Sequence, residues 1–329
     1  MNIFKKIIIV IAICLVIGSG YIYFSPVPTA ALVHQLFKNG VAVPPKHYTS
    51  IEAQTKRFNH IDYASEYDDG QLDIVVPKNV DTPLPTILWV HGGAYVGGDK
   101  KDVTEYAVQL AAKGYAVINM NYELAPSAKY PTPLKQMDEV YAFLIANSQK
   151  YNLDLNNLFI AGDSAGAQIA SQYINIQVDH DYAKKVGFQQ VIEPSTIRGA
   201  LLFCGPYDLA AFANTGSSKT LNFIFDRIAW AYIGEKDWRN AEATKLASLT
   251  DTVSKNYVPS FITDGNSGSF EDHGKKLGAI LKSYAIPVEE VYYPLDEAKL
   301  EHEYQFKMDT KQAQATFDSL LKFTKEQSS

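Results

Sequence analysis

Short apolar runs alternate with amphipathic stretches through most of this 329-residue chain. The apolar runs have the length of buried strands, and the stretches between them repeat apolar residues at helical spacing. Strands are expected at 86–90, 116–120, 158–162, 199–203, 260–263 and 288–293. Helices are expected at 102–114, 133–148, from 164 onward, at 270–284 and at 311–326. This alternation predicts an α/β fold, with a mostly parallel central sheet covered by helices on both faces.

Two segments depart from the alternation. Residues 58–64 and 71–77 flank a turn at Asp69-Gly70 and predict an opening β-hairpin. Between the strands at 199–203 and 260–263 lie about 55 residues, and 220–234 within them are rich in aromatic side chains. We expect the insertion, at about 206–256, to be a helical lid or pocket wall.

The first 24 residues follow a third pattern. Lys5 and Lys6 precede an uncharged run of 18 residues, 7–24, which is at the lower limit for crossing a bilayer. A cleaved signal peptide or a buried core helix would also be apolar, but the run ends in aromatic residues rather than small ones. Aromatic residues suit a membrane interface, and the lysines favour a cytoplasmic N-terminus. We therefore expect 1–24 to be a cytoplasmic stub and single-pass transmembrane signal anchor, with the remaining chain on the extracytoplasmic side of the cell membrane.

Residues 25–57 are expected to be a tether and N-terminal cap segment, and 58–329 the main domain.

Composition limits which ligands and cofactors are possible. The formal net charge is -6 and no basic stretch exceeds a lysine pair, which argues against nucleic-acid binding. Two cysteines exclude a disulfide framework, and no Cys/His spacing indicates a metal site. No cofactor is expected, and the oligomeric state stays open.

The segment Gly162-Asp163-Ser164-Ala165-Gly166 has the pattern G-x-S-x-G. A serine that merely begins a helix would explain Ser164 without chemistry. In a nucleophile elbow, however, glycines two residues before and after the serine allow a tight turn between a buried strand and a helix. The flanking sequence predicts that strand and helix, so we interpret Ser164 as a candidate nucleophile.

A second glycine-rich segment, His91 to Gly98, follows the predicted strand at 86–90. Four glycines could serve a turn alone. Consecutive glycines after a buried strand also leave main-chain N–H groups uncovered, and an oxyanion hole needs such groups. The two motifs in this order, each at a strand end, are more specific than either one alone.

These motifs resemble those of hormone-sensitive-lipase-like esterases, a family of α/β-hydrolases. Its H-G-G-G/A motif is similar to His91–Ala94, its G-D-S-A-G elbow to Gly162–Gly166, and its Y-R-L-A-P segment to Tyr122–Pro126, with Glu123 in place of arginine. The resemblance covers roughly 71–306. It implies that Ser164 is the nucleophile and that His91 supports its loop. It further implies an oxyanion hole from the amides of these residues: Gly92, Gly93, Ala94 and Ala165.

The base must be another histidine. The α/β-hydrolase order of nucleophile, acid and then histidine leaves His180, His273 and His302. His302 follows the last predicted strand, where the family has H-G-F, although Glu303 replaces the glycine. We expect His302 to be the base, the alternative being a solvated charge cluster in "EHE".

The acid is less well determined. The family position falls on Ser267 or Gly268, and neither carries a charge. Asp264 lies at the end of the penultimate strand, whereas Glu271 begins the next helix, where an acidic residue often only complements the helix dipole. We expect Asp264 to be the acid, with Glu271 as the alternative.

The expected function is hydrolysis of short- to medium-chain acyl esters, of small molecules or lipids, through an acyl-enzyme. Two alternatives remain. One is an α/β-hydrolase-fold protein with weak or no catalysis that binds a ligand, and the other is a serine amidase or peptidase with the same triad.

Overall fold

The computed structural model describes residues 3–38, 40–216 and 218–328. Within the first helix, the side chains of 9–10, 13–17 and 19 also lie outside the description.

An eight-stranded sheet forms the centre of the molecule, in the order β1-β2-β4-β3-β5-β6-β7-β8. Its strands are β1 (Thr55–Asp62), β2 (Gln71–Pro77), β3 (Leu84–Val90), β4 (Ala116–Met120), β5 (Leu153–Asp163), β6 (Ile197–Phe203), β7 (Ser260–Thr263) and β8 (Val288–Val291). β2 pairs antiparallel with both β1 and β4, and the other neighbours pair in parallel. The expected hairpin and mostly parallel sheet are therefore present, although β1 begins three residues before position 58.

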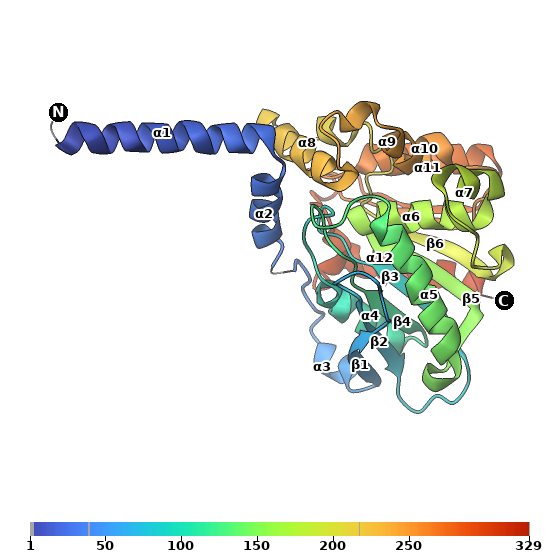
Figure 1. The fold of residues 1–329 in the computed structure, drawn as a ribbon. Coiled ribbons are helices and arrows are strands. Elements are labelled where there is room, and N and C mark those ends of the chain that lie inside the picture. The colour runs from blue at the N-terminus through green and yellow to red at the C-terminus, as the bar shows by residue number, and fades with distance from the viewer. Residues whose placement is uncertain (1–2, 39, 217, 329) are drawn as a thin grey trace.

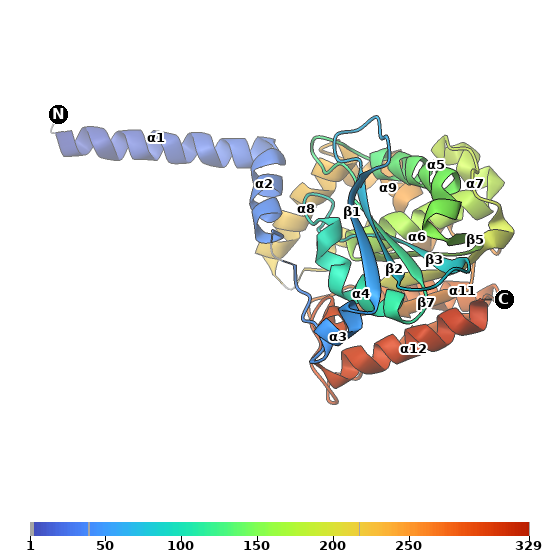
Figure 2. The same cartoon turned by 90° about the horizontal axis from the view of Figure 1, so that it is seen from below.

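Helices cover both faces of this sheet (Figures 1 and 2). α4 (Thr104–Ala112) and α12 (Lys311–Gln327) share one hydrophobic cluster with Ile87 and Trp89 of β3. α5 (Thr132–Tyr151), α6 (Ala165–Val178) and α11 (Glu271–Ser283) share the other cluster with Leu88 and Val90. Because successive strand residues point to opposite faces, an unbroken apolar strand is what a sheet buried on both sides requires.

The insertion between β6 and β7 is helical. It contains the 3₁₀ turns η3 (Phe212–Asn214) and η4 (Trp238–Asn240) and the helices α8 (Lys219–Ile233), α9 (Glu242–Ala247) and α10 (Leu249–Thr252). Stacking of Phe212 on Phe225, with ring centroids 4.8 Å apart, joins η3 to α8. Among the short elements that the sequence did not indicate are η1 (Lys100–Val103), α7 (His180–Val186), η2 (Pro194–Thr196) and η5 (Tyr304–Phe306).

The N-terminal segment forms α1 (Ile3–Phe24), α2 (Val27–Leu36) and α3 (Tyr48–Glu52), and α1 extends away from the body (Figure 1). The expected transmembrane helix at 1–24 is not found, since no helix of the described residues is both long and apolar enough to cross a bilayer. Part of that expected span, including 13–17, lies outside the residues whose side chains are described. The segment 25–57 packs on the body: Val43 pairs with Lys307, and α2 contacts α8.

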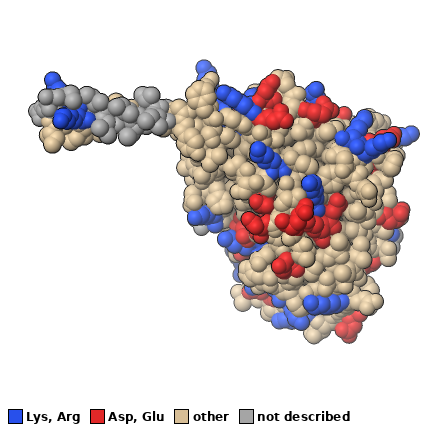
Figure 3. Space-filling model, viewed as in Figure 1, with Lys and Arg blue, Asp and Glu red and all other residues tan. Residues whose placement is uncertain are grey.

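Acidic and basic side chains are interspersed on the face of the body seen in Figure 3. No continuous basic surface is visible on that face.

Candidate active site

Ser164 occupies a strained turn between β5 and α6. Its φ of 50° and ψ of -120° lie outside the helical and extended regions, as in a nucleophile elbow. The flanking glycines allow this turn because the backbone segments nearly touch. A Cβ on Gly166 would lie 2.1 Å from the carbonyl oxygen of Val90, and one on Gly162 would lie 2.4 Å from that of Gly166. The elbow is therefore pressed directly against the end of β3.

The loop after β3 presents backbone N–H groups beside this elbow. Gly93 and Ala94 have positive φ values, 113° and 54°. Within the described residues, their amides donate to no protein acceptor. Ala94 and Ala165 line the same cavity as Ser164, and Ala165 begins α6, where amides have no partner inside the helix. Three of the expected oxyanion donors are thus available to a ligand.

Gly92 differs from the other predicted oxyanion residues. Its N–H donates to Asp163 Oδ2 at 2.8 Å, and Trp89 Nε1 donates to Asp163 Oδ1 at 2.7 Å. The Gly92 amide therefore holds the loop and is not free for an oxyanion.

His91 lies within the loop as a supporting side chain. It is buried, its Nδ1 donates to its neighbour's carbonyl, Gly92 O, at 2.6 Å, and its ring stacks on Tyr122 with centroids 4.5 Å apart. Tyr122 in turn donates its hydroxyl to His91 O at 3.0 Å. The His91 imidazole therefore points toward the protein core.

His302 lies against the candidate nucleophile, with Nε2 2.9 Å from Ser164 Oγ. The two other histidines in the permitted chain order are elsewhere. His180 is exposed at the start of α7, and His273 accepts the amide hydrogen of Asp208 at 3.2 Å. Of the three candidates, His302 is thus the one that contacts Ser164.

The predicted acid does not touch the imidazole directly. Asp264 is buried at the end of β7, but the hydroxyl of Ser269 lies between it and His302. Ser269 Oγ is 2.6 Å from His302 Nδ1 and donates to Asp264 Oδ1. The alternative acid, Glu271, pairs with Lys275 at 2.9 Å. Neither Ser267 nor Gly268 replaces the missing carboxylate.

Ser269 is the site residue that the sequence did not indicate. It lies one or two residues after the position where the family has its acid, and a serine there carries no charge to attract attention. Glu303 was visible as a substitution for the family glycine, but nothing in its spacing pointed to the partner described next.

Burial governs the charges of the site. Burial lowers the pKa of His302 to about 4, and no charged partner touches Nδ1 to oppose it. Burial also raises the pKa of Asp264 to about 7, although hydrogen bonds from Ser269 and Cys204 act in the other direction. The imidazole is therefore neutral at neutral pH, as a general base must be.

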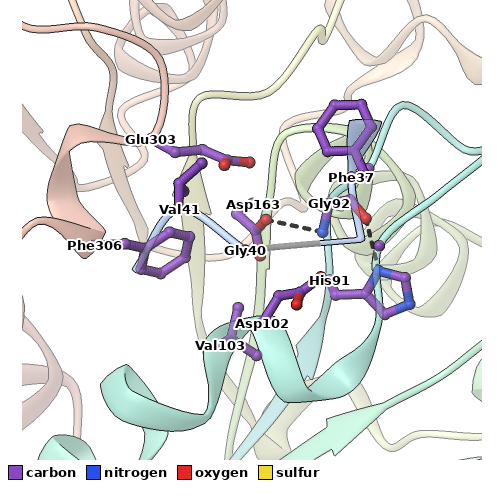
Figure 4. Close-up of a pocket in the computed structure, with 12 residues that line it drawn as sticks. Phe37, Gly40, Val41, His91, Gly92, Asp102, Val103, Asp163, Glu303 and Phe306 are labelled. Carbon is purple, nitrogen blue, oxygen red and sulfur yellow. Dashed lines mark hydrogen bonds between the residues drawn. The ribbon is translucent and has the colours of Figure 1, made fainter. Parts of the chain in front are cut away.

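Two buried carboxyl groups meet behind the glycine loop (Figure 4). Glu303 is hydrogen-bonded to Asp163, and burial raises the pKa of Asp163 to about 6 and that of Glu303 well above its ordinary value. Asp102 lines the same small cavity, of about 30 Å³, and burial raises its pKa to about 6. Burial thus favours the protonated form of the Glu303 carboxyl, the form that can donate to Asp163.

A second cavity, of about 200 Å³, opens at Ser164 and His302. Its walls are largely apolar and come from the N-terminal segment, the glycine loop, the insertion and the loop after β7: Phe37, Ala94, Tyr95, Pro206, Phe212, Phe225 and Phe270. The N-terminal cap segment thus contributes Phe37 to the surroundings of the candidate nucleophile.

Cys204, Asp264 and His302 have possible metal-ligand atoms within 4.8 Å of one another. These atoms already have partners, since Ser269 bonds both Asp264 and His302. Burial also raises the pKa of the Cys204 thiol well above its ordinary value, so it is not the thiolate that binds metal. The cluster is better suited to hydrogen bonding than to holding an ion.

The carboxyl pair makes a prediction about stability. The folded-state pKa values of Asp163 and Glu303 lie above their unfolded values, so the folded state binds more protons than the unfolded state. The free energy of unfolding therefore decreases as pH rises from the unfolded pKa values through the folded ones. Glu303→Gln keeps a donor for Asp163 but cannot ionise. Urea unfolding at pH 5 and pH 8 should show a smaller decrease for Glu303→Gln than for the natural chain. Equal decreases would mean that the pair is not protonated in the folded state.

Known proteins share the fold or part of the sequence of this chain. The crystal structure of esterase B from Lactobacillus rhamnosis superposes with a TM-score of 0.74 at 17% identity, covering 96% of this chain and 95% of that one. An esterase from Gibberella moniliformis is 27% identical over 63% of this chain and 64% of its own length. Kynurenine formamidase from Salmo salar is 27% identical over 51% of this chain and 55% of its own. The matched part is less than two thirds of either relative.

The sequence pattern of the BD-FAE family matches residues 72–271, more than half of the chain. The matched residues include the glycine loop, the elbow and the start of α11. Together with the fold, this agrees with the resemblance to hormone-sensitive-lipase-like esterases. The chain is an α/β-hydrolase and belongs to the BD-FAE family.

Proposed function

We propose that this protein is a serine hydrolase that cleaves carboxylic esters with short to medium acyl chains. The observation that carries the proposal is the 2.9 Å contact between Ser164 Oγ and His302 Nε2, at the edge of an apolar cavity that Ala94 and Ala165 also line. A nucleophile, a neutral base and oxyanion donors are the groups that acyl transfer needs.

The reaction follows from this geometry. His302 Nε2 takes the Ser164 proton while Oγ bonds to the acyl carbon, and the carbonyl electron pair moves to the oxygen, which the amides of Gly93, Ala94 and Ala165 stabilise. As the oxyanion collapses, the C–O bond to the alcohol breaks and His302 returns the proton to the leaving oxygen. Water then attacks the acyl-enzyme with His302 again as base, which releases the acid and restores Ser164.

The size of the cavity supports a small acyl group. About 200 Å³ is below the roughly 300–1,000 Å³ of pockets that hold drug-sized ligands. Phenyl rings of η3, α8 and the loop after β7 form one wall, in which Phe212, Phe225 and Phe270 lie within 6.2 Å of one another, centroid to centroid. We propose that α8 serves as a lid, with Phe225 closing the acyl site.

Amide hydrolysis is the second candidate, because one relative is named a formamidase. The same nucleophile and base would serve both reactions, and the leaving group differs. An anilide in the substrate panel separates the two.

Ser164→Ala should abolish ester turnover. Removing Oγ deletes the nucleophile, and only background hydrolysis by the remaining groups is left, about 10³- to 10⁶-fold slower. Turnover of p-nitrophenyl butyrate and labelling by a fluorophosphonate probe both report the change, and the melting temperature should stay close to that of the natural chain.

Ser171→Ala is the matched control, since Ser171 lies on the same helix and its hydroxyl donates to the carbonyl of Gln168 at 2.9 Å. It should keep full activity. Undiminished activity in Ser164→Ala would exclude the mechanism, and a folded natural chain that neither labels nor hydrolyses any ester would favour the ligand-binding alternative.

Phe225→Ala should lengthen the preferred acyl chain. The lost ring enlarges the cavity, and each methylene accommodated in an apolar site contributes about 1–3 kcal/mol to discrimination. The ratio of kcat/KM for p-nitrophenyl octanoate to that for butyrate should rise about tenfold. Leu221→Ala, on the exposed side of α8, should leave the ratio unchanged. An unaltered ratio in Phe225→Ala would remove this residue from the acyl site.

We also propose that residues 1–24 anchor the protein in the cell membrane, with the hydrolase on the extracytoplasmic side. The support is the uncharged run after Lys5 and Lys6, in a segment that forms one continuous helix, α1. Charges within such a helix cost about 2.5–3.5 kcal/mol each on insertion. Ile8→Asp with Ile11→Asp should therefore move the full-length protein from carbonate-washed membranes to the aqueous fraction. Ile145→Asp, an exposed position on the body, should not, and a natural chain that is aqueous from the start would refute the anchor.

A further inference from the structure

A serine hydroxyl stands where an α/β-hydrolase ordinarily has a carboxylate beside the catalytic imidazole. Four side chains form a continuous series, Ser164–His302–Ser269–Asp264, with 2.9 Å between the first pair and 2.6 Å between the second. The deeper end of the series, Asp264, is 2% exposed, and hydrogen bonds connect its carboxylate to the imidazole through the Ser269 hydroxyl.

The number of hydrogens available in this series determines which group donates each hydrogen bond. An ionised carboxylate only accepts hydrogen bonds, and Asp264 already accepts from the amides of Gly265 at 2.7 Å and Phe270 at 3.1 Å. Ser269 has a single hydroxyl hydrogen, which it donates to Asp264 Oδ1. Its oxygen can then only accept from His302, so the imidazole hydrogen must lie on Nδ1. The lone pair of Nε2 therefore points at Ser164 Oγ, as proton abstraction requires.

We propose that Ser269 is a positioning residue for the ester hydrolysis proposed above: its hydroxyl, oriented by Asp264, holds His302 in the Nδ1–H tautomer. The inference rests on that proposed function for its kinetic consequence only. The tautomer that His302 adopts, and the role of the Ser269 hydroxyl in maintaining it, do not depend on turnover.

The surrounding loops do not need the Ser269 side chain to keep their shape. Asn266 Nδ2 donates to Ala298 O at 2.7 Å, and Leu300 N donates to Asn266 Oδ1 at 3.0 Å. Ser267 N donates to Leu300 O at 3.0 Å as well. These bonds join the loop after β7 to the loop that carries His302. Loss of the Ser269 hydroxyl should consequently change the imidazole and leave the backbone in place.

Protonation of Asp264 would reverse the direction in which hydrogen bonds are donated between Asp264, Ser269 and His302. A neutral Asp264 can donate to Ser269, which frees the serine hydrogen to point at Nδ1 and favours the unproductive Nε2–H tautomer. The titratable groups facing Asp264 are Cys204, Tyr207, Tyr292, Glu303 and His302. Burial raises the pKa of each of the first four, which favours their neutral forms.

The pH dependence of turnover should therefore report Asp264. Its raised pKa, about 7, lies above the lowered pKa of His302, about 4, so Asp264 is the first of the two to protonate as pH falls. In the natural chain kcat should rise with pH through the neutral range. In a variant without the Ser269 hydroxyl, no hydrogen bond connects His302 to Asp264 through that side chain. The rise of kcat with pH should then shift or disappear.

The kinetic test uses the full-length chain with Ser269→Ala, Ser269→Thr and, as a matched control from the same loop, Ser267→Ala. Ser269→Ala should lower kcat for p-nitrophenyl butyrate by about 10²-fold or more with KM changed by less than about threefold, the size expected when a general base is misoriented. Ser269→Thr keeps a hydroxyl and should recover most of the rate. Ser267→Ala should stay within about twofold of the natural chain.

Two results would overturn the inference while leaving Ser164 as nucleophile. One is a Ser269→Ala enzyme with the natural kcat and pH profile. The other is a Ser269→Thr enzyme as slow as Ser269→Ala with an unchanged melting temperature, because the hydroxyl would then not be what matters. Loss of turnover in Ser164→Ala distinguishes both from failure of the proposed function.

A spectroscopic arm tests the inference even in a chain that turns over no ester. Histidine ¹⁵N shifts at pH 8 report which ring nitrogen carries the hydrogen. We expect His302 of the natural chain to be the Nδ1–H tautomer and Ser269→Ala to show a mixture. An Nε2–H tautomer in the natural chain, or one unaltered by Ser269→Ala, would refute it.

Discussion

The carboxylate of Asp163 joins the two halves of the site, and the remaining geometry depends on it. It lies at the end of β5 and accepts hydrogen bonds from Trp89 and Gly92, both on or just after β3. These bonds fix the glycine loop beside the elbow, where the absence of a Cβ on Gly166 allows contact. Parallel neighbouring strands end at one edge of the sheet, so a single side chain at that edge can hold both motifs in register.

Burial, more than ion pairing, sets the protonation states around this edge. Burial favours the protonated form of Glu303 beside Asp163, and it favours the neutral form of the His302 imidazole. Water is a better solvent for charges than a protein interior, so enclosed groups favour their neutral forms. The site therefore combines a neutral base with a carboxyl pair that favours binding a proton, and the pKa of Asp264, about 7, makes it a group whose charge changes near neutral pH.

The cavity draws on parts of the chain that lie far apart in sequence. Phe37 comes from the N-terminal segment, Phe225 from the insertion and Phe270 from the loop after β7. Phe270 also packs edge-on against His302, with centroids 5.5 Å apart. The same ring thus borders both the cavity and the imidazole, so the packing of Phe270 joins the proposed acyl site to the proposed base.

The sequence by itself determined the strand–helix alternation, the elbow at Ser164, the glycine loop and the choice of His302, because each rests on spacing over a few residues or on chain order. The eight strands and the principal helices were recognisable for the same reason, whereas short elements such as α7 were missed because a single turn or two leaves little periodicity. The tertiary structure alone decided that Ser269 separates Asp264 from His302, that Glu303 bonds Asp163 and that Gly92 is not free for an oxyanion. Ser269 and His302 are 33 positions apart on two loops, and a shift of one side chain's length there determines whether a carboxylate or a hydroxyl reaches the imidazole. Such distances follow from the paths of the packed loops, which no local pattern specifies.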